Sequence, residues 1–185
     1  MRLLRTIRLD PSDTFVFERA AEPGEWAVSG AFLFAEEAAE AAELSGKRLA
    51  AFRGGFLGAE SFGWSTLVQI VDASDSDRAA LVETLVQRLL ADFGAPDIAA
   101  ACAAAEDEVA FAASLCDHPA GTLIAVRRQF EDGAIREAFR SLHARGERKP
   151  MRAFSFLDVE GEDNDEPGEA VDLAQLAAAP QPHKA

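Results

Sequence analysis

The residues with the greatest potential for chemistry lie in one segment rich in glycine and aromatic side chains, residues 53–66 (RGGFLGAESFGWST). This glycine-aromatic segment holds four glycines, three large aromatic residues, an arginine and a glutamate. Glycine lets the backbone approach a ligand closely, and aromatic rings beside polar groups are common on recognition surfaces. The segment is therefore the first candidate for a binding site. The predicted ligand-binding residues are Arg53, Gly54, Gly55, Phe56, Gly58, Glu60, Phe62 and Trp64.

Two interpretations of this segment remain open. In the functional one, the backbone N–H groups of Gly54–Gly58 and the Arg53 guanidinium hold an anion, while the aromatic rings wall an apolar pocket. In the structural one, the glycines form a bulge or hairpin and the rings fill the core. The segment has neither a Walker sequence, because no Gly-Lys-Ser/Thr follows the glycines, nor the dinucleotide fingerprint.

The order of predicted elements around the segment carries a resemblance. A strand at Arg48–Arg53, the sequence Arg53-Gly54-Gly55, a strand at Thr66–Asp72 and an amphipathic helix follow one another. This order resembles that of biotin and lipoate ligases, which bind an acyl-adenylate against a glycine loop and use a lysine on a following strand. No lysine lies between Lys47 and Lys149. The resemblance therefore implies, at most, a ligand pocket without the catalytic lysine.

The other reactive side chains form no recognisable catalytic or metal site. Cys116-Asp117-His118 places three reactive groups side by side, but a nucleophile and its base must converge in space. Cys102 and Cys116 share one predicted helix and lie roughly 21 Å apart at 1.5 Å per residue, so they neither pair nor share a metal. The acidic sequence Glu106-Asp107-Glu108 is interpreted as a solvated helix face. We predict no metal and no cofactor.

Apolar periodicity and helix-breaking residues predict irregularly alternating strands and helices. The predicted strands are Leu3–Leu9, Trp26–Phe34, Arg48–Arg53, Thr66–Asp72, Thr122–Phe130 and Arg152–Val159. The predicted helices are Glu36–Leu44, an amphipathic helix that starts near Ser74–Asp77 and stops at Gly94, one from Pro96 or Asp97 to Cys116, and Ala134–Ala144. Several strands are amphipathic, which favours an α+β fold: a single domain with a mainly antiparallel or mixed sheet packed with about four helices.

Composition divides the chain into a folded part and a tail. Residues 1–160 are predicted to form the α+β domain. Residues 161–185 are rich in acidic residues, glycine, alanine and proline, which predicts a flexible acidic tail. Charge is also uneven, because Arg127–Arg152 is mainly basic and Asp158–Asp172 is strongly acidic. Contact between the tail and the basic region is left open.

Net charge and cysteine content limit the function classes. The formal charge is −14 over 185 residues, which argues against nucleic acid and against an anionic membrane as partners. No apolar run approaches the roughly 20 residues needed to cross a bilayer. The chain has only two cysteines, so no disulfide framework is predicted. These features together predict a cytoplasmic protein.

Four short sequences carry a resemblance that spans nearly the whole chain except the tail. They are Phe15-Val16-Phe17, Glu25-Trp26-Ala27-Val28-Ser29-Gly30, Arg53-Gly54-Gly55-Phe56 and Arg152-Ala153-Phe154-Ser155-Phe156-Leu157. They resemble a family of short proteobacterial proteins with no assigned activity, so the resemblance implies no catalytic residue.

Three functional hypotheses follow. The leading one is a non-catalytic cytoplasmic accessory or binding protein, which takes a protein partner or a small anionic or acyl-bearing ligand at the glycine-aromatic segment. The alternative is an enzyme acting on a small acidic or acyl ligand, with Arg53 as the anion anchor and the Gly54–Gly58 backbone as its cradle. The third is a structural subunit of a larger complex, which predicts an exposed apolar patch.

Overall fold

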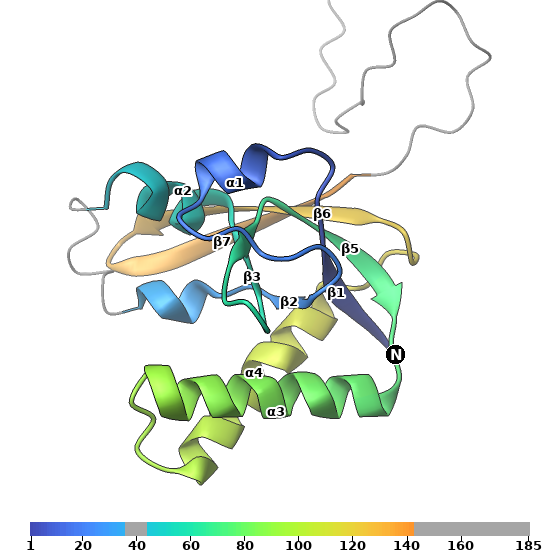
Figure 1. Ribbon diagram of the computed structural model, residues 1–185, viewed down its shortest axis with the longest axis vertical. Coiled ribbons are helices and arrows are strands. Elements are labelled where there is room, and N and C mark those ends of the chain that lie inside the picture. Colours follow the sequence, from blue (N-terminus) through green and yellow to red (C-terminus); the bar gives the residue numbers. More distant parts are fainter. Residues whose placement is uncertain (36–43, 143–185) are drawn as a thin grey trace, which may run out of the picture. The chain divides into compact units, whose positions relative to one another are not determined.

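The computed structural model describes residues 1–35 and 44–142, which form one antiparallel sheet with helices on both faces (Figure 1). The strands are β1 (Arg2–Ile7), β2 (Trp26–Val28), β3 (Phe56–Gly58), β4 (Trp64–Ser65), β5 (Leu67–Asp72), β6 (Leu123–Glu131) and β7 (Ala134–Leu142). The helices are α1 (Ser12–Val16), the 3-10 helix η1 (Ala31–Phe34), α2 (Gly46–Gly54), α3 (Asp75–Asp92) and α4 (Ile98–Ser114). The predictions of a helix over residues 36–43, a strand at Arg152–Val159 and a tail at 161–185 lie outside the described residues.

The sheet has seven strands in the order β4-β3-β2-β1-β5-β6-β7, and every neighbouring pair is antiparallel. β1 lies at the centre, and its Leu3 and Leu4 are fully buried because both faces of the sheet are covered. The predicted α+β class with an antiparallel sheet and about four helices is confirmed.

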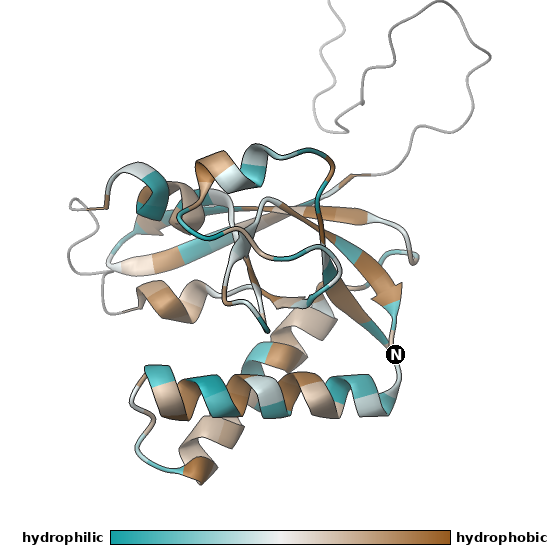
Figure 2. Cartoon of the chain, viewed as in Figure 1, coloured by the Kyte–Doolittle hydropathy of each residue, from teal (hydrophilic) through white to brown (hydrophobic). Residues whose placement is uncertain are grey.

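α3 and α4 pack against each other, and Figure 1 shows them on the opposite side of the sheet from α1 and α2. The predicted amphipathic helix is α3. Its N-terminus is closed by a capping box in which Ser74 accepts from the Asp77 backbone and the Asp77 side chain accepts from the Ser74 backbone. Figure 2 shows hydrophobic and hydrophilic residues alternating along α3, and Leu81 and Leu85 are buried on its inner face. α4 begins after Asp97, whose side chain accepts from the Ala100 N–H. Both helices were predicted from the sequence.

The prediction of a strand at Arg48–Arg53 is wrong, because these residues form α2. Lysine, arginine, leucine and alanine all favour helix, and these residue types fill α2. The helix is held in place by Ala51 and Phe52, which are buried, and the Phe52 ring stacks on Phe130 of β6 with centroids 4.2 Å apart. The short apolar run in these residues therefore marks the buried face of a helix and not a strand.

The prediction of a helix at Ala134–Ala144 is also wrong, because β7 extends over Ala134–Leu142. The residues favour helix individually, yet Ile135, Glu137 and Phe139 alternate with exposed neighbours along the strand. β7 pairs with β6 along its whole length in a hairpin, and this pairing overrides the helix propensity of the individual residues.

The predicted strand Trp26–Phe34 is shorter in the structure, since β2 ends at Val28. Gly30 has φ of 76°, a left-handed conformation that turns the chain out of the sheet and into η1. None of the helices in the described ranges has the length and apolar character needed to cross a bilayer.

Candidate functional site

The glycine-aromatic segment folds as the end of α2 followed by the β3–β4 hairpin, with glycines where backbone and rings pack closely. A Cβ added at Gly55 would lie 2.8 Å from the Trp64 ring, and one at Gly63 would lie 2.5 Å from the Ala20 backbone. Only glycine fits at such distances. Packing therefore accounts for two of the glycines without a ligand.

The backbone N–H groups of the hairpin turn are occupied by a carboxylate from the chain itself. Glu25, whose side chain is buried, accepts from the N–H groups of Glu60 at 3.0 Å and Ser61 at 2.8 Å. It also accepts from the N–H of Glu22. The turn is thus an anion-binding concavity whose anion is the Glu25 carboxylate.

The other residues predicted to bind a ligand point to different parts of the molecule. The Arg53 side chain is exposed at the end of α2, and the Glu60 side chain is exposed in the hairpin turn. Phe56 is buried with its ring 6.1 Å from that of Phe139, and Trp64 is buried 5.3 Å from Phe34. The structure does not gather these side chains in one open pocket, and ligand binding at this segment stays a prediction.

Phe62 in the hairpin turn is connected by ring contacts to a cavity that the sequence did not predict. Its ring stacks on Phe93 at the end of α3, with centroids 5.5 Å apart, and the Arg88 guanidinium lies over the Phe62 ring, 5.2 Å from its centroid. Phe93 in turn meets the ring of Phe32 edge-on at 6.3 Å. Phe32, the last of these three rings, lines the cavity.

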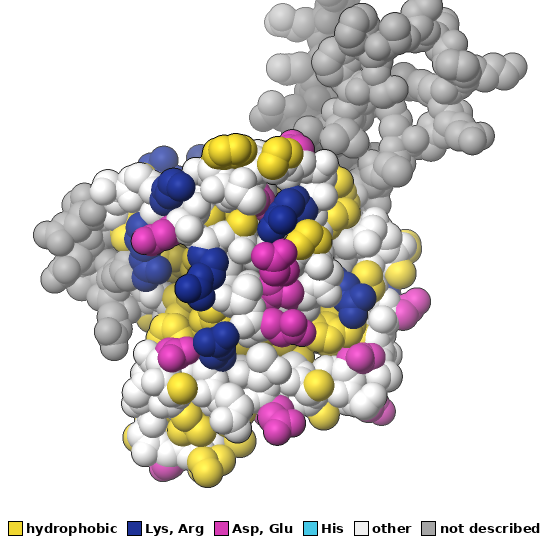
Figure 3. All heavy atoms as spheres, in the orientation of Figure 1, with side chains coloured by type: hydrophobic (Ala, Val, Ile, Leu, Met, Phe, Trp, Pro, Cys, Tyr) yellow, Lys and Arg dark blue, Asp and Glu magenta, His cyan; other side chains and the backbone are white. Residues whose placement is uncertain are grey.

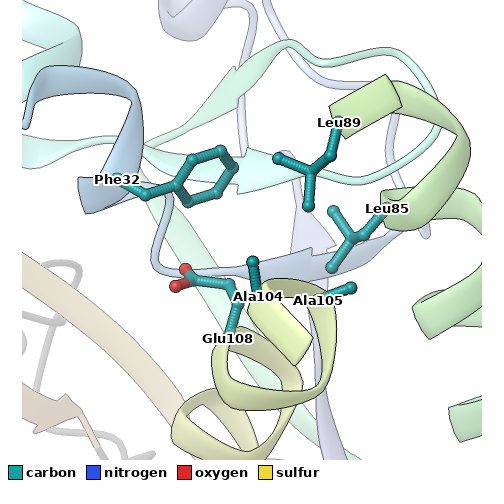
Figure 4. A pocket seen from close by; sticks show the side chains of 6 residues that line it. All are labelled: Phe32, Leu85, Leu89, Ala104, Ala105 and Glu108. Carbon is teal, nitrogen blue, oxygen red and sulfur yellow. The ribbon is translucent and has the colours of Figure 1, made fainter. Parts of the chain in front are cut away.

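The cavity has a volume of about 80 Å³ and lies between η1, α3 and α4 (Figure 4). Leu85 and Leu89 project into it from α3, and the Glu108 carboxyl lies on the far side, below the Phe32 ring. Ala104 and Ala105 of α4 complete the wall, and their short side chains leave the space open. The Glu108 cavity is therefore apolar except for one carboxyl group, the composition typical of small-molecule sites.

Phe32 also lines a second, wider hollow. That hollow has a volume of about 340 Å³ and is lined from η1 and from the β6–β7 turn. Its lining residues are Ala31, Phe32, Ala35, Gly133, Ala134 and Ile135. Phe32 is the residue that lines both the cavity and the hollow.

Burial raises the pKa of the Glu108 carboxyl, and the nearby Glu137 carboxylate raises it further. A hydrogen bond from the Gly30 N–H at 2.9 Å and the positive charge of Arg128 oppose this shift without cancelling it. A carboxyl with a raised pKa inside a cavity is a common mark of a functional site.

Arg128 binds a carboxylate, three backbone carbonyl groups and a hydroxyl group through its buried guanidinium. Its side chain is fully buried on β6, and it forms an ion pair from Nε to Glu137 Oε1 at 2.7 Å. The remaining donors reach the carbonyl oxygens of Phe52, Gly55 and Ser29 and the Ser29 hydroxyl. A guanidinium has five N–H donors, and these contacts use all of them. Arg128 therefore holds α2, β2 and β7 together and has no donor left for a ligand.

In the Cys116-Asp117-His118 sequence, the Cys116 thiol is buried. Burial raises the pKa of the Cys116 thiol to about 11, so the nucleophilic thiolate is disfavoured. In the part of the chain that the structure describes, no group of three or more potential ligands is placed to hold a metal ion.

The comparisons with known proteins give one match. Residues 1–156 match a family described as a family of unknown function, DUF6505. The chain belongs to the DUF6505 family. No curated protein and no solved structure matches it. Every residue of the Glu108 cavity and of the Arg128 ion pair lies within the range that matches DUF6505.

Sequence reasoning missed the two residues that matter most at this site of the DUF6505 protein, although signals for both were present. Glu108 follows the helical spacing of three buried alanines of α4, Ala101, Ala105 and Ala112, and therefore lies on the inner face of the helix. It is partly buried, whereas the sequence was interpreted as a solvated face. Arg128 alternates with the apolar core residues of β6, a pattern that places it inside.

Proposed function

We propose that this DUF6505 protein is a binding protein that holds a small, largely apolar ligand in the Glu108 cavity. The observation that carries the proposal is the cavity itself, about 80 Å³ lined by apolar side chains and one carboxyl group. Space of this kind excludes bulky or highly charged ligands, because their polar groups would lose hydration without gaining partners. The proposal moves the binding site from the glycine-aromatic segment to the adjoining cavity, and only Phe62 of the predicted set lies near it.

We favour binding over the enzyme alternative for two reasons. The Arg53 side chain, the proposed anion anchor, is exposed at the end of α2, and within the proposed Gly54–Gly58 cradle the N–H groups of Gly55 and Gly58 already donate to the carbonyl oxygens of Ala51 and Gly63. The proposal includes a cytoplasmic location, which the two free thiols Cys102 and Cys116 support. The proteobacterial origin suggested by the sequence stays a prediction.

Saturation-transfer NMR with isobutanol tests this function in the full chain. We expect transfer to isobutanol in the wild-type protein and its loss in Ala104→Leu, because the added side chain occupies the cavity. Ala103→Leu is the matched control, since Ala103 is exposed on the same helix and does not line the cavity. Equal transfer in all three proteins would contradict binding in the cavity. Ala104→Val replaces Ala104→Leu if the latter unfolds.

A second candidate function, docking of a protein partner, is favoured by one observation. Large apolar side chains are exposed on and beside α1, and Figure 3 shows apolar side chains along this edge. Phe15 is 73% exposed and Leu9 is 64% exposed, so both could be covered by a partner. A photo-crosslinking residue at position 15 should give a discrete adduct in the native host, while one at the exposed Glu18 should not. Absence of an adduct at position 15 would remove this candidate.

A further inference from the structure

The carboxyl group in the cavity has one oxygen that the protein leaves available. Glu108 Oε1 accepts from the Gly30 N–H at 2.9 Å. No described residue donates to its second oxygen. Since Glu108 lines the cavity, a ligand there meets a carboxyl group that can still accept a hydrogen bond.

The surrounding charges do not supply a donor for that oxygen. The five N–H groups of Arg128 are all engaged elsewhere. The Oε1 atom of Glu137 already accepts from Arg128 and from the Ser29 hydroxyl. Glu108 and Glu137 are thus two carboxyl groups beside a single guanidinium, and a positive charge in the cavity would balance them.

We propose that the ligand of the Glu108 cavity is a compact apolar primary amine, held by its ammonium group on the free oxygen of Glu108. This inference rests on the proposed binding function. The apolar body of the amine packs among Phe32, Leu85 and Leu89. An ammonium group is costly to bury unless it is paired, and Glu108 provides the pair.

Other small ligands of the same shape are less well matched to the site. A carboxylic acid brings a second negative charge beside Glu108 and Glu137 and is repelled when ionised. An alcohol can donate a hydrogen bond to the Glu108 carboxylate, but it brings no positive charge to balance Glu108 and Glu137. The amine is therefore the class that the geometry favours.

Binding of the amine should weaken at low pH, because it requires ionised Glu108. The pKa of this carboxyl is raised, so the loss begins at a higher pH than for an ordinary glutamate. The described charged groups that face it from other elements are Arg128 on β6 and Glu137 on β7. The raised pKa supports the inference, but the main evidence is the cavity and the second oxygen of Glu108, to which no described residue donates.

The test compares isobutylamine, isobutanol and isobutyrate, which share one apolar body, by NMR titration of the full chain at neutral pH. We expect isobutylamine to bind about tenfold more tightly than isobutanol and isobutyrate to bind most weakly. Glu108→Gln should remove the preference for the amine, so that isobutylamine binds no more tightly than isobutanol. Asp107→Asn is the matched control, because Asp107 is exposed on the same helix.

The outcomes separate this inference from the proposed function. If isobutanol binds and is lost in Ala104→Leu but the amine binds no more tightly, the amine inference is wrong and the cavity function stands. Preference for the amine that persists in Glu108→Gln, or amine binding that survives in Ala104→Leu, also overturns the inference. If none of the three probes binds, the proposed function itself fails.

Discussion

Arg128 is the residue whose loss should affect the fold most, because it joins three elements through one buried charge. Replacing it by methionine keeps much of the volume but removes the positive partner of the Glu137 carboxylate and the Arg128 donors to three carbonyl groups. Breaking a buried ion pair in this way costs about 3–5 kcal/mol of unfolding free energy. Urea unfolding of Arg128→Met measures it. Arg127→Met is the control, since Arg127 is exposed on the same strand and should change stability by no more than about 0.5 kcal/mol.

Glu25 makes a second residue-scale prediction, because its carboxylate satisfies three backbone N–H groups. Glu25→Ala should lower the unfolding free energy by about 2–3 kcal/mol, since buried donors are left unpaired. Glu60→Ala serves as the control, because it removes only an exposed side chain and keeps the backbone N–H. If both variants have the same unfolding midpoint in urea, the internal carboxylate does not hold the turn together.

The raised pKa of the Glu108 carboxyl should make the stability of the protein depend on pH. Its pKa is raised above 4.5 in the folded protein by burial, so between the unfolded and folded pKa values the native state binds more protons. The stabilising contribution of the protonated group is full below the unfolded pKa and is lost as pH rises through the folded pKa. Glu108→Gln stays neutral and still accepts from Gly30, so its stability should rise relative to wild type as pH increases from 4.5 towards neutrality. A difference that stays constant over this range in urea unfolding would show that Glu108 is not buried as described.

At the scale of elements, the turn between β6 and β7 sets the register that brings Arg128 opposite Glu137. Gly133 in this turn has φ of 73° and open space around it, so Gly133→Ala should cost about 1–2 kcal/mol from backbone strain alone. Gly54 at the end of α2 has no positive φ, and an added Cβ would meet only a carbonyl oxygen at an ordinary 3.8 Å. Gly54→Ala should therefore stabilise by about 0.4–1 kcal/mol. Thermal unfolding measures both, and shifts of the same sign would contradict this account of the two glycines.

Elements with strong local signals were predictable from the sequence. α3 combines an apolar stripe with the Ser74–Asp77 capping box, and β6 alternates regularly. α2 was mispredicted because it packs on a partner distant in sequence, Phe130, and β7 because its helix-favouring residues pair with the adjacent strand β6 in a hairpin. The candidate site was missed because it, like α2, depends on segments distant in sequence. The cavity is formed by η1, α3 and α4, and no single one of these elements reveals the space between them.

At the scale of the whole molecule, charge is spread without a dominant basic surface on the face that Figure 3 shows, where basic side chains flank a strip of acidic ones. With a net charge of −14, long-range attraction favours cationic ligands over anionic ones. The Glu108 cavity has the same preference at short range. The net charge of the protein and the carboxyl group in the cavity therefore both favour an apolar ligand that carries a positive charge.

The most direct test of the central claim, that the Glu108 cavity is the binding site, is a crystal structure of the full chain soaked in isobutanol. The account predicts electron density for the probe between Phe32, Leu85 and Leu89, with its hydroxyl group within hydrogen-bonding distance of Glu108. Density for the probe at the glycine-aromatic segment instead, or a collapsed cavity filled by the Phe32 ring, would contradict it.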